Sequence, residues 1–544
     1  MLSILGEKRD RRGLLNDFCR HIFLLFGTLV TFIFLRDYFL LNNAYLIDAV
    51  VVGLLGSYFK LQPSTKFFRF LFYSMVLICL FYILAAYPTL PSDIVNQEGR
   101  NWLSFKLYPT LSVFMCLGAF WRPTLLLVPI CQIHWQKIQL WNMSGVHLST
   151  TDYLTILEFG LLLVSGFLFV QFVALALRLK KGIQRNLFGR FFEKTDEEKV
   201  GQCQLSKLDI IAYFAVCTHM GNYLHSGIKK LRLGDDPFSW IIESQTQFLT
   251  VTTHVVGQLP ITFGGNFFVN IYPFLENNIV VINFTTVILQ LLCVFCVFKI
   301  NWIKLITIAY DLQHVIIFLL SGIFFWKWIW LNTTIILGLR YLKTTALGVP
   351  LVLIGALLVV FSPLAFSIAT LGWFETRAFN KAHFKAHTAD GSSFIVPSNY
   401  FGSFSLTAAQ QGIARPFEGH FETSTLANTQ KRDTMLLAES CTLPTSERSK
   451  LANKKNTERM NNFIKNHHRY VLEKINEDGI WNYDLYPHHM WSNLASFNDF
   501  FELDKRKIVR YSYHVDSVCL SVINGVIEEK NVLSGSIEVE VTDV

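Results

Sequence analysis

Stretches of about 20 mostly apolar residues recur over the first two thirds of the chain, and they limit the fold it can adopt. A helix needs about this length to cross the hydrocarbon core of a bilayer. Residues 123–140 form a doubtful further candidate, because Gln132, His134, Gln136 and Lys137 interrupt it. We therefore expect an α-helical polytopic membrane protein with nine or ten spans, the nine clearer ones being residues 18–41, 45–58, 70–87, 107–121, 153–177, 208–226, 279–298, 303–331 and 346–371.

Composition and charge agree with a membrane protein. Hydrophobic residues make up 52% of the chain and charged residues 16%, against about 25% charged in an ordinary soluble domain. The net charge of +8 does not require nucleic acid, because the basic clusters 8–12, 60–69 and 178–194 flank apolar stretches, where cytoplasmic loops carry Lys and Arg. This pattern places the N-terminus in the cytoplasm. The first apolar stretch has no small-residue cleavage site, so we expect no cleavable signal peptide.

The composition changes after residue 371, which divides the chain into a transmembrane domain, residues 1–371, and a soluble domain, residues 372–544. Turn signals around Asp390 and Gly391 predict short strands, helical spacing covers 458–476, and alternating residues near the end predict two or three strands. Residues 406–460 are polar and weakly patterned, which is typical of a flexible insertion. The expected C-terminal unit is therefore a strand-rich α+β domain.

Cysteine and histidine usage indicates neither a disulfide framework nor a metal site. Most of the ten cysteines lie inside apolar stretches, where cysteine is usually a small hydrophobe, and Cys293 and Cys296 share that setting despite their CxxC spacing. The pairs His467–His468 and His488–His489 are adjacent, and neighbouring side chains point apart on a helix or strand. We interpret both pairs as surface histidines and expect no metal.

Several polar residues in or near the predicted spans need a physical reason, because such residues are costly in a bilayer. Glu158 lies inside one span, and Asp311 and His314 are three residues apart in another, on one helix face. They form either an inter-helix hydrogen-bonded pair or the wall of a polar cavity. The long outer loop 231–278 carries Asp235, Asp236 and Glu243, which either meet basic partners or form a solvated surface.

A pair of lysines, Lys229 and Lys230, follows the predicted span 208–226. One interpretation is snorkelling, in which the stems lie in the apolar zone and the ammonium groups reach water. The other is a lysine held at a dry boundary, where desolvation lowers its pKa and makes it usable as a base. The charge pattern alone favours snorkelling, since basic residues are common at span ends.

The stretch Tyr-Leu-His-Ser-Gly-Ile-Lys-Lys-Leu, residues 223–231, followed by an acidic turn and Trp240, resembles a segment of the vitamin K-dependent gamma-glutamyl carboxylases. These enzymes belong to the wider family of horizontally transferred transmembrane (HTTM) domain proteins. The resemblance extends to residues 313–324, where His314 precedes a Gly-x-Phe pair, and to Trp373 with the Asp390–Gly391 turn. It implies that the C-terminal domain and the active face lie on the outer, periplasmic or lumenal, side of a bacterial inner membrane or an ER-type membrane.

The resemblance also implies an activity and a set of site residues. Lys230 matches the base that deprotonates reduced vitamin K or a related quinol, with O2 and CO2 as co-substrates and a glutamate-containing peptide as acceptor. The acceptor glutamate would gain its second carboxylate in a dry pocket near cationic groups. Supporting and substrate-binding roles fall, from their positions near the motif or in the family layout, on His225, Lys229, Arg232, Asp311, His314, Trp240, Trp373 and Lys381.

The sequence also departs from the family pattern. The family's Asn-His pair before the lysine span has no match, because residues 149–154 read Ser-Thr-Thr-Asp-Tyr-Leu, and residues 361–366 lack the histidine near the last span. The retained Lys230 favours a carboxylase-like membrane enzyme that uses a quinol. The missing histidines favour a non-carboxylating HTTM relative that binds a lipid or quinone, or acts as an immunity or transport component. Scaffold similarity alone does not decide between these alternatives.

Overall fold

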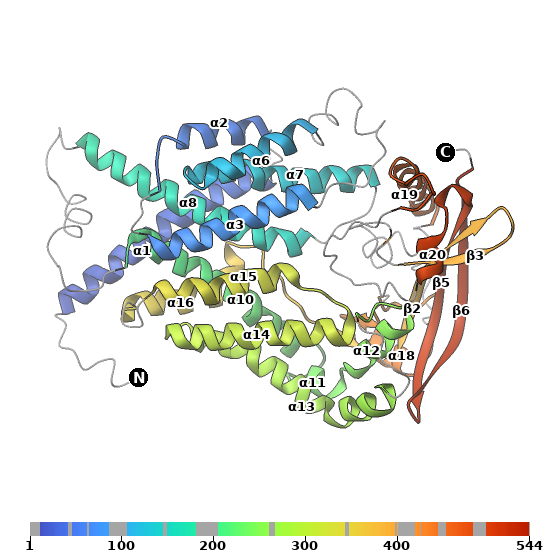
Figure 1. Cartoon of the computed structure of the whole chain (residues 1–544). Coiled ribbons are helices and arrows are strands. Elements are labelled where there is room, and N and C mark those ends of the chain that lie inside the picture. The colour runs from blue at the N-terminus through green and yellow to red at the C-terminus, as the bar shows by residue number, and fades with distance from the viewer. Residues whose placement is uncertain are drawn as a thin grey trace.

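The computed structural model describes residues 11–41, 46–61, 65–85, 106–144, 150–180, 205–260, 267–342, 347–397, 400, 419–424, 426–443, 453–481 and 497–542. The helices gather into one bundle, and the long strands lie at one end of it (Figure 1). The N-terminal end of α1 and the C-terminal end of α8 both lie at the opposite end of the bundle (Figure 1). The strand-rich part of the chain and the basic N-terminal end of the bundle are therefore far apart.

Five helices in the described part of the chain are long and apolar enough to cross a membrane. The first is α1 (Arg11–Arg36), which continues through the π-helical turn η2 (Asp37–Leu41). The other four are α3 (Lys66–Ala85), α8 (Thr150–Lys180), α13 (Phe267–Cys296) and α14 (Ile300–Ser321).

Further helices complete the bundle: α2 (Leu46–Gly56), α6 (Tyr108–Ala119), η4 (Pro123–Leu126), α7 (Leu127–Ser144), α10 (Lys207–Leu231), α15 (Trp326–Gly338), η6 (Leu339–Tyr341), α16 (Val349–Phe361) and η7 (Ser362–Leu364). Helix α2 has 11 residues, which extend about 16 Å, roughly half of a hydrocarbon core. The polar residues that interrupt α7 fit its position, because Gln132, His134 and Gln136 are buried inside the protein. The expected count of nine or ten spans remains a prediction.

Several predicted boundaries are wrong for identifiable reasons. The stretch 303–331 is two helices, because Gly322 takes a left-handed conformation (φ 67°) that ends α14. The last span does not continue to residue 371, since α16 ends at Phe361 and Pro363 follows shortly. The stretch 231–278, predicted to be an outer loop, contains α11 (Ser239–Glu243), α12 (Gln247–Val255) and the first turns of α13.

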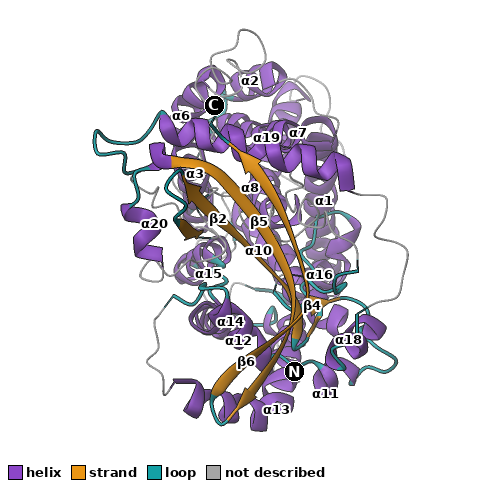
Figure 2. Ribbon diagram, turned by 90° about the vertical axis from the view of Figure 1, so that its right-hand side faces the viewer, coloured by secondary structure: helices purple, strands orange, loops and turns teal. Residues whose placement is uncertain are grey.

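The C-terminal region is built on a four-stranded antiparallel sheet in the order β3-β2-β5-β6. Its strands are β2 (Ala378–Thr388), β3 (Ser393–Val396), β5 (Ile508–Ile523) and β6 (Val526–Glu540), and the sheet lies across one end of the bundle (Figure 2). The expected Asp-Gly turn joins β2 to β3. An Asn-Gly turn joins β5 to β6, with Asn524 and Gly525 both at positive φ, as a tight hairpin requires.

Smaller elements complete this region: β1 (Phe374–Glu375) pairs with β4 (Asn428–Thr429), and α18 (Arg432–Glu439), α19 (Asn453–Leu472), α20 (Asn498–Glu502) and η11 (Lys505–Lys507) accompany the sheet. Apolar side chains of β2, β5 and α19 form a common core, among them Phe384, Tyr511, Tyr513, Met460 and Ile464. The helix expected at 458–476 and the two strands near the end of the chain are confirmed.

Three expectations for this region are wrong. His467 and His468 are buried, because α19 packs that face against the sheet and His468 Nδ1 lies 3.1 Å from the Tyr511 hydroxyl. Part of the supposed flexible insertion forms β4 and α18. A disulfide, Cys441–Cys519, joins the residues that follow α18 to β5. The pair His488–His489 and the rest of the insertion lie outside the described residues.

Candidate functional site

Lys230 lies at the C-terminal end of α10, beyond the predicted span, and its side chain is buried. Its Nζ donates to the carbonyl oxygen of Leu371 at 2.5 Å and to Oε1 of Gln290, on α13, at 3.2 Å. The ammonium also lies 5.3 Å from the centre of the Trp240 ring, on α11. This is not a snorkelling lysine, because the ammonium faces the protein and its polar contacts are protein atoms.

Residues 367–375, the connecting segment, run from the last helix of the bundle to β1. Backbone groups that lack helix or sheet partners need other hydrogen bonds when they are buried. Every second residue bonds a polar side chain, which is the period of an extended chain. The bonded pairs are Ser367 with Glu158, Ala369 with Asn222 and Ser226, Leu371 with Ser226 and Lys230, Trp373 with Trp240, and Glu375 with Ser244.

Three of these partners form one stripe on α10. Asn222, Ser226 and Lys230 recur every four residues and therefore share a helix face. Glu158 supplies both of its oxygens to Ser367, one to the amide at 2.6 Å and one to the hydroxyl at 2.8 Å. Glu158, one of the polar residues predicted to be costly inside the bundle, thus helps to hold the connecting segment in place. Lys230 is the last residue of the α10 stripe.

A buried carboxyl, Glu375, lies in the same region. Its Oε2 accepts hydrogen bonds from the hydroxyls of Ser244 at 2.5 Å and Thr246 at 3.3 Å. Burial raises the pKa of Glu375, and the Ser244 hydroxyl and the charge of Lys230 oppose that rise. Within the described residues no carboxylate lies within 4.0 Å of the Lys230 ammonium, so the two groups interact without forming an ion pair.

The electrostatics of Lys230 favour its neutral amine. Burial lowers the pKa of Lys230 to about 8, and the charge of Glu375 opposes that fall. A lysine base must lose its proton near the working pH, and desolvation is the usual way a protein achieves this. The site therefore holds a buried amine that is neutral above about pH 8 and can then accept a proton.

A second group of polar side chains lies deeper in the bundle, and we call it the inner polar cluster: His219 and Tyr223 of α10, Asp311 and His314 of α14, and Asn332 of α15. Asn332 links three of the others, each at 2.8 Å: Oδ1 bonds His219, and Nδ2 donates to the Tyr223 hydroxyl and to Asp311. The Tyr223 ring stacks on Tyr310 with centroids 3.7 Å apart. Tyr223 precedes Lys230 by seven residues, about 10 Å along the helix.

The structure divides the predicted site residues between several places. Trp240 lies over Lys230, and Trp373 takes part through its carbonyl oxygen, which accepts from the Trp240 indole at 2.6 Å. His314 lies near Tyr223 and Phe325 in the inner polar cluster, where Asp311 also lies. These two residues share that cluster, as expected, but Asp311 bonds residues of α15 and not His314.

The other predicted residues lie apart from the Lys230 ammonium. His225 Nε2 lies 3.0 Å from the carbonyl oxygen of Val360, Arg232 is exposed after the end of α10, and the stem of Lys229 packs near Gly372. Lys381 pairs with Glu529 at 2.7 Å within the C-terminal sheet. Sequence reasoning did not assign Gln290, Glu375, Asn222 or Ser226 to the site. Only the four-residue spacing of the α10 stripe could have indicated part of this set.

Comparison of the chain with family models, with curated proteins and with solved structures finds no match. The function proposed below is therefore inferred from the geometry of the chain's own residues.

Proposed function

We propose that the protein is an integral membrane enzyme of the carboxylase-like type, in which Lys230 acts as a base toward a lipid-soluble quinol. The observation that carries this proposal is the buried amine of Lys230, with its lowered pKa, on which groups from separate elements converge: Leu371, Gln290 and the Trp240 ring. Reduced vitamin K or a related quinol, with O2, would supply the strong base that removes the γ-proton of a peptide glutamate before CO2 adds. Lys230 accepts the first phenolic proton, and Trp240 excludes water from its amine.

The residues around Lys230 fit a quinol in two respects. An ordinary phenol has a pKa near 10, so an amine with a pKa of about 8 accepts its proton far more readily than water does. The Trp240 indole provides an apolar aromatic surface of the kind that lines small-molecule sites.

We infer that the C-terminal domain lies on the outer side of the membrane. The N-terminal end of α1 and the C-terminal end of α8, which the basic clusters flank in the sequence, lie at the end of the bundle opposite the sheet, so the positive-inside rule supports an outer sheet (Figure 1). The Cys441–Cys519 disulfide supports the same side, since disulfides persist in the periplasm, the ER lumen and the cell exterior. A maleimide that cannot cross the membrane tests this orientation. Labelling of a cysteine in this domain only when the reagent has access to the cytoplasmic side would contradict it.

The alternative function is a non-carboxylating relative that binds a lipid or quinone, or an immunity or transport component. The connecting segment favours it, because Lys230 donates to Leu371 as one contact in a series whose other members are structural. In this reading Lys230 anchors the segment, and its proton never leaves. The two functions differ in what an arginine at position 230 would do, since arginine donates hydrogen bonds but does not act as a base.

A turnover assay on protein in nanodiscs separates these functions. The assay supplies reduced vitamin K or menaquinone, O2, labelled bicarbonate and a Glu-rich peptide, and follows quinone epoxide and fixed label. We expect Lys230→Arg and Lys230→Ala to lose both products, and the matched control Lys229→Ala to keep them. Epoxide without fixed label would indicate an oxygenase with another acceptor. Tight quinone binding without turnover in the unmodified protein would establish the alternative.

A further inference from the structure

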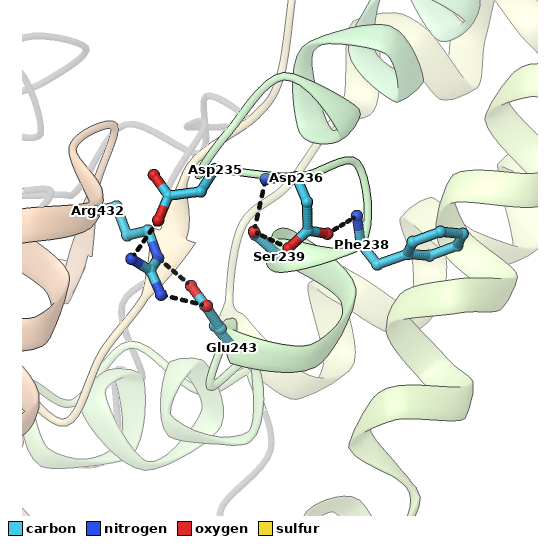
Figure 3. A network of polar contacts seen from close by, with 6 residues as sticks. All are labelled: Asp235, Asp236, Phe238, Ser239, Glu243 and Arg432. Carbon is cyan, nitrogen blue, oxygen red and sulfur yellow. Dashed lines mark hydrogen bonds and ion pairs between the residues drawn. The ribbon is translucent and has the colours of Figure 1, made fainter.

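Arg432, the first residue of α18, joins the C-terminal domain to the segment that follows α10. Its Nε and Nη2 donate to the two carboxylate oxygens of Glu243, each at 2.7 Å, and its Nη1 donates to Asp235 at 2.6 Å (Figure 3). Two of the three acidic residues that the sequence left open between a solvated surface and basic partners, Asp235 and Glu243, therefore do meet a basic partner. A bidentate arginine–carboxylate pair fixes the relative orientation of its partners as well as their distance.

Glu243 is the last residue of α11, and Trp240 lies on the same five-residue helix. A helix this short is not stable by itself, so contacts outside it must hold it in place. Asp236 and Ser239 hold its start, because Asp236 accepts from the amide of Phe238 at 2.7 Å and from the Ser239 hydroxyl at 3.1 Å (Figure 3). The Arg432–Glu243 pair holds its end. Both ends of α11 are thus fixed by side chains, and the C-terminal domain also contacts this region through Trp373, which accepts from the Trp240 indole, and through Glu375, which bonds Ser244.

Helix α18, which carries Arg432, is itself fastened at both ends. Met435, one turn after Arg432, is buried in a cluster with Trp240, Leu233 and Phe374. The disulfide from Cys441 then ties the end of α18 to β5. A rigid connection therefore runs from the sheet through α18 to α11, and from α11 to the ammonium of Lys230.

We propose that Arg432 is a positioning residue for Lys230: its pair with Glu243 holds α11 against the end of α10, and α11 keeps Trp240 over the ammonium. Loss of the pair removes the contact between α18 and the end of α11, so that Trp240 is held less firmly and water reaches Nζ more easily. The contact with Asp235 contributes less, because the Asp235 side chain is 78% exposed and that of Glu243 is 25% exposed. This role of Arg432 concerns the surroundings of Lys230 and does not depend on the proposed carboxylase activity.

The readout is the pH profile of Lys230 modification by cyanate, a small reagent that reacts with neutral amines. Full-length protein in nanodiscs is labelled at a series of pH values, and the peptide that contains Lys230 is quantified by mass spectrometry. The unmodified protein should show a midpoint near 8. In Arg432→Gln the midpoint should move up toward 10.5, the ordinary value for lysine, because the ammonium becomes hydrated.

Three further variants make the test specific. Lys431→Gln is the matched control, since Lys431 is the neighbouring cation but pairs with Glu422 of its own domain at 3.5 Å. The midpoint of Lys230 modification in this variant should stay near 8. Glu243→Gln removes the other partner of the same ion pair and should raise the Lys230 midpoint as Arg432→Gln does. The charge-reversed double variant Arg432→Glu with Glu243→Arg should restore part of the lower midpoint.

Two results would overturn the proposal. One is an unchanged midpoint in both Arg432→Gln and Glu243→Gln, in protein that elutes as folded material and melts normally. The other is an equal shift in Lys431→Gln, which would show that any loss of charge on α18 has the same effect. If Arg432→Gln does not fold, Glu243→Gln and the double variant decide the question, since they remove and restore the same contact.

Discussion

Two lysines of this protein are buried in similar surroundings, and they differ in where their partners come from. Lys230 and Lys505 both donate to backbone carbonyl oxygens and lie over aromatic rings, Trp240 at 5.3 Å and Phe500 at 4.6 Å. Burial lowers the pKa of both side chains to about 8. Burial, aromatic contact and a lowered pKa therefore do not by themselves distinguish a candidate base from a structural lysine.

The partners distinguish them. Lys505 donates to the carbonyls of Phe500 and Leu503, each at 2.7 Å, which lie within five residues of it and end the short helix α20. Lys230 instead bonds Leu371 and Gln290, which are 141 and 60 residues away and belong to different elements. The local set has the form of a helix C-cap, where a cation bonds the last carbonyl groups. The distant set brings several elements to one amine, which is the arrangement expected of a site.

The largest expected difference between the two lysines is in the pH profile of turnover. If Lys230 is the base, kcat/KM should rise with pH and level off above about 8, so that pH 6 gives about a 100-fold lower value than the plateau. Lys505→Met should leave that midpoint unchanged. A midpoint that moves in Lys505→Met would show that the two buried lysines cannot be separated in this way.

A smaller effect is expected in the stability of the C-terminal domain. Lys505→Met removes the donor from two closely bonded buried carbonyl groups, which should lower the free energy of unfolding by about 1–3 kcal/mol. Chemical denaturation, followed by the accessibility of a cysteine placed in β5, measures it. Lys507→Met, which changes an exposed neighbour, should leave stability unchanged, and an equal loss there would contradict the capping role.

The same lysine should make stability depend on pH in a defined direction. The unfolded state holds its proton up to about pH 10.5, whereas the folded state releases it near 8, so between these values the unfolded state binds more protons. Stability therefore rises as pH increases from 8 to 10.5. Lys505→Met should abolish this part of the rise, as denaturation at pH 8 and pH 10 would show. If Lys505→Met keeps the full rise in stability between pH 8 and pH 10, another group causes that rise.

The smallest effect concerns the stripe on α10 that leads to Lys230. Ser226→Ala removes the acceptor for the amide of Leu371 and a donor to the carbonyl of Ala369. We expect a loss of about 1–2 kcal/mol, because one buried backbone amide is left without a partner. Thermal unfolding in nanodiscs measures it, with Ser165→Ala as the control, since Ser165 bonds only within its own helix. Equal losses would mean that the connecting segment depends little on the stripe.

Much of the fold could be predicted from the sequence. Long apolar stretches predicted most helices of the bundle, and alternation with turn residues predicted β5, β6 and the hairpin of β2 and β3. Two of the wrong boundaries share one cause, which is that hydropathy does not reveal where a helix ends inside an apolar stretch. Gly322 divides one apolar stretch into two helices, and an apolar sequence after Phe361 forms the extended connecting segment.

The candidate site could be predicted only in part. Lys230 and Trp240 are close in sequence, and their motif identified both. Glu375, Gln290 and Arg432 reach the same region from sequence positions up to about 200 residues away, and a single sequence gives no signal for such contacts. His225 and Lys229 are not among the contacts of the Lys230 ammonium, because neighbours in a helix point to different sides. Arg432 lies in a stretch whose polar composition indicated flexibility.

The disulfide between Cys441 and Cys519 also affects the order in which the protein matures. Synthesis delivers the bundle first and α18 later, but the cysteine that fastens α18 belongs to β5, 78 residues after its partner. During that interval Lys230 is already in place, while α18, which holds α11 and its Trp240 over the ammonium, is not yet linked to β5. On the proposed outer location of the C-terminal domain, a newly made chain would carry an open amine until β5 has crossed into an oxidising compartment. Oxidation would then complete the surroundings of Lys230 as a late step of biogenesis.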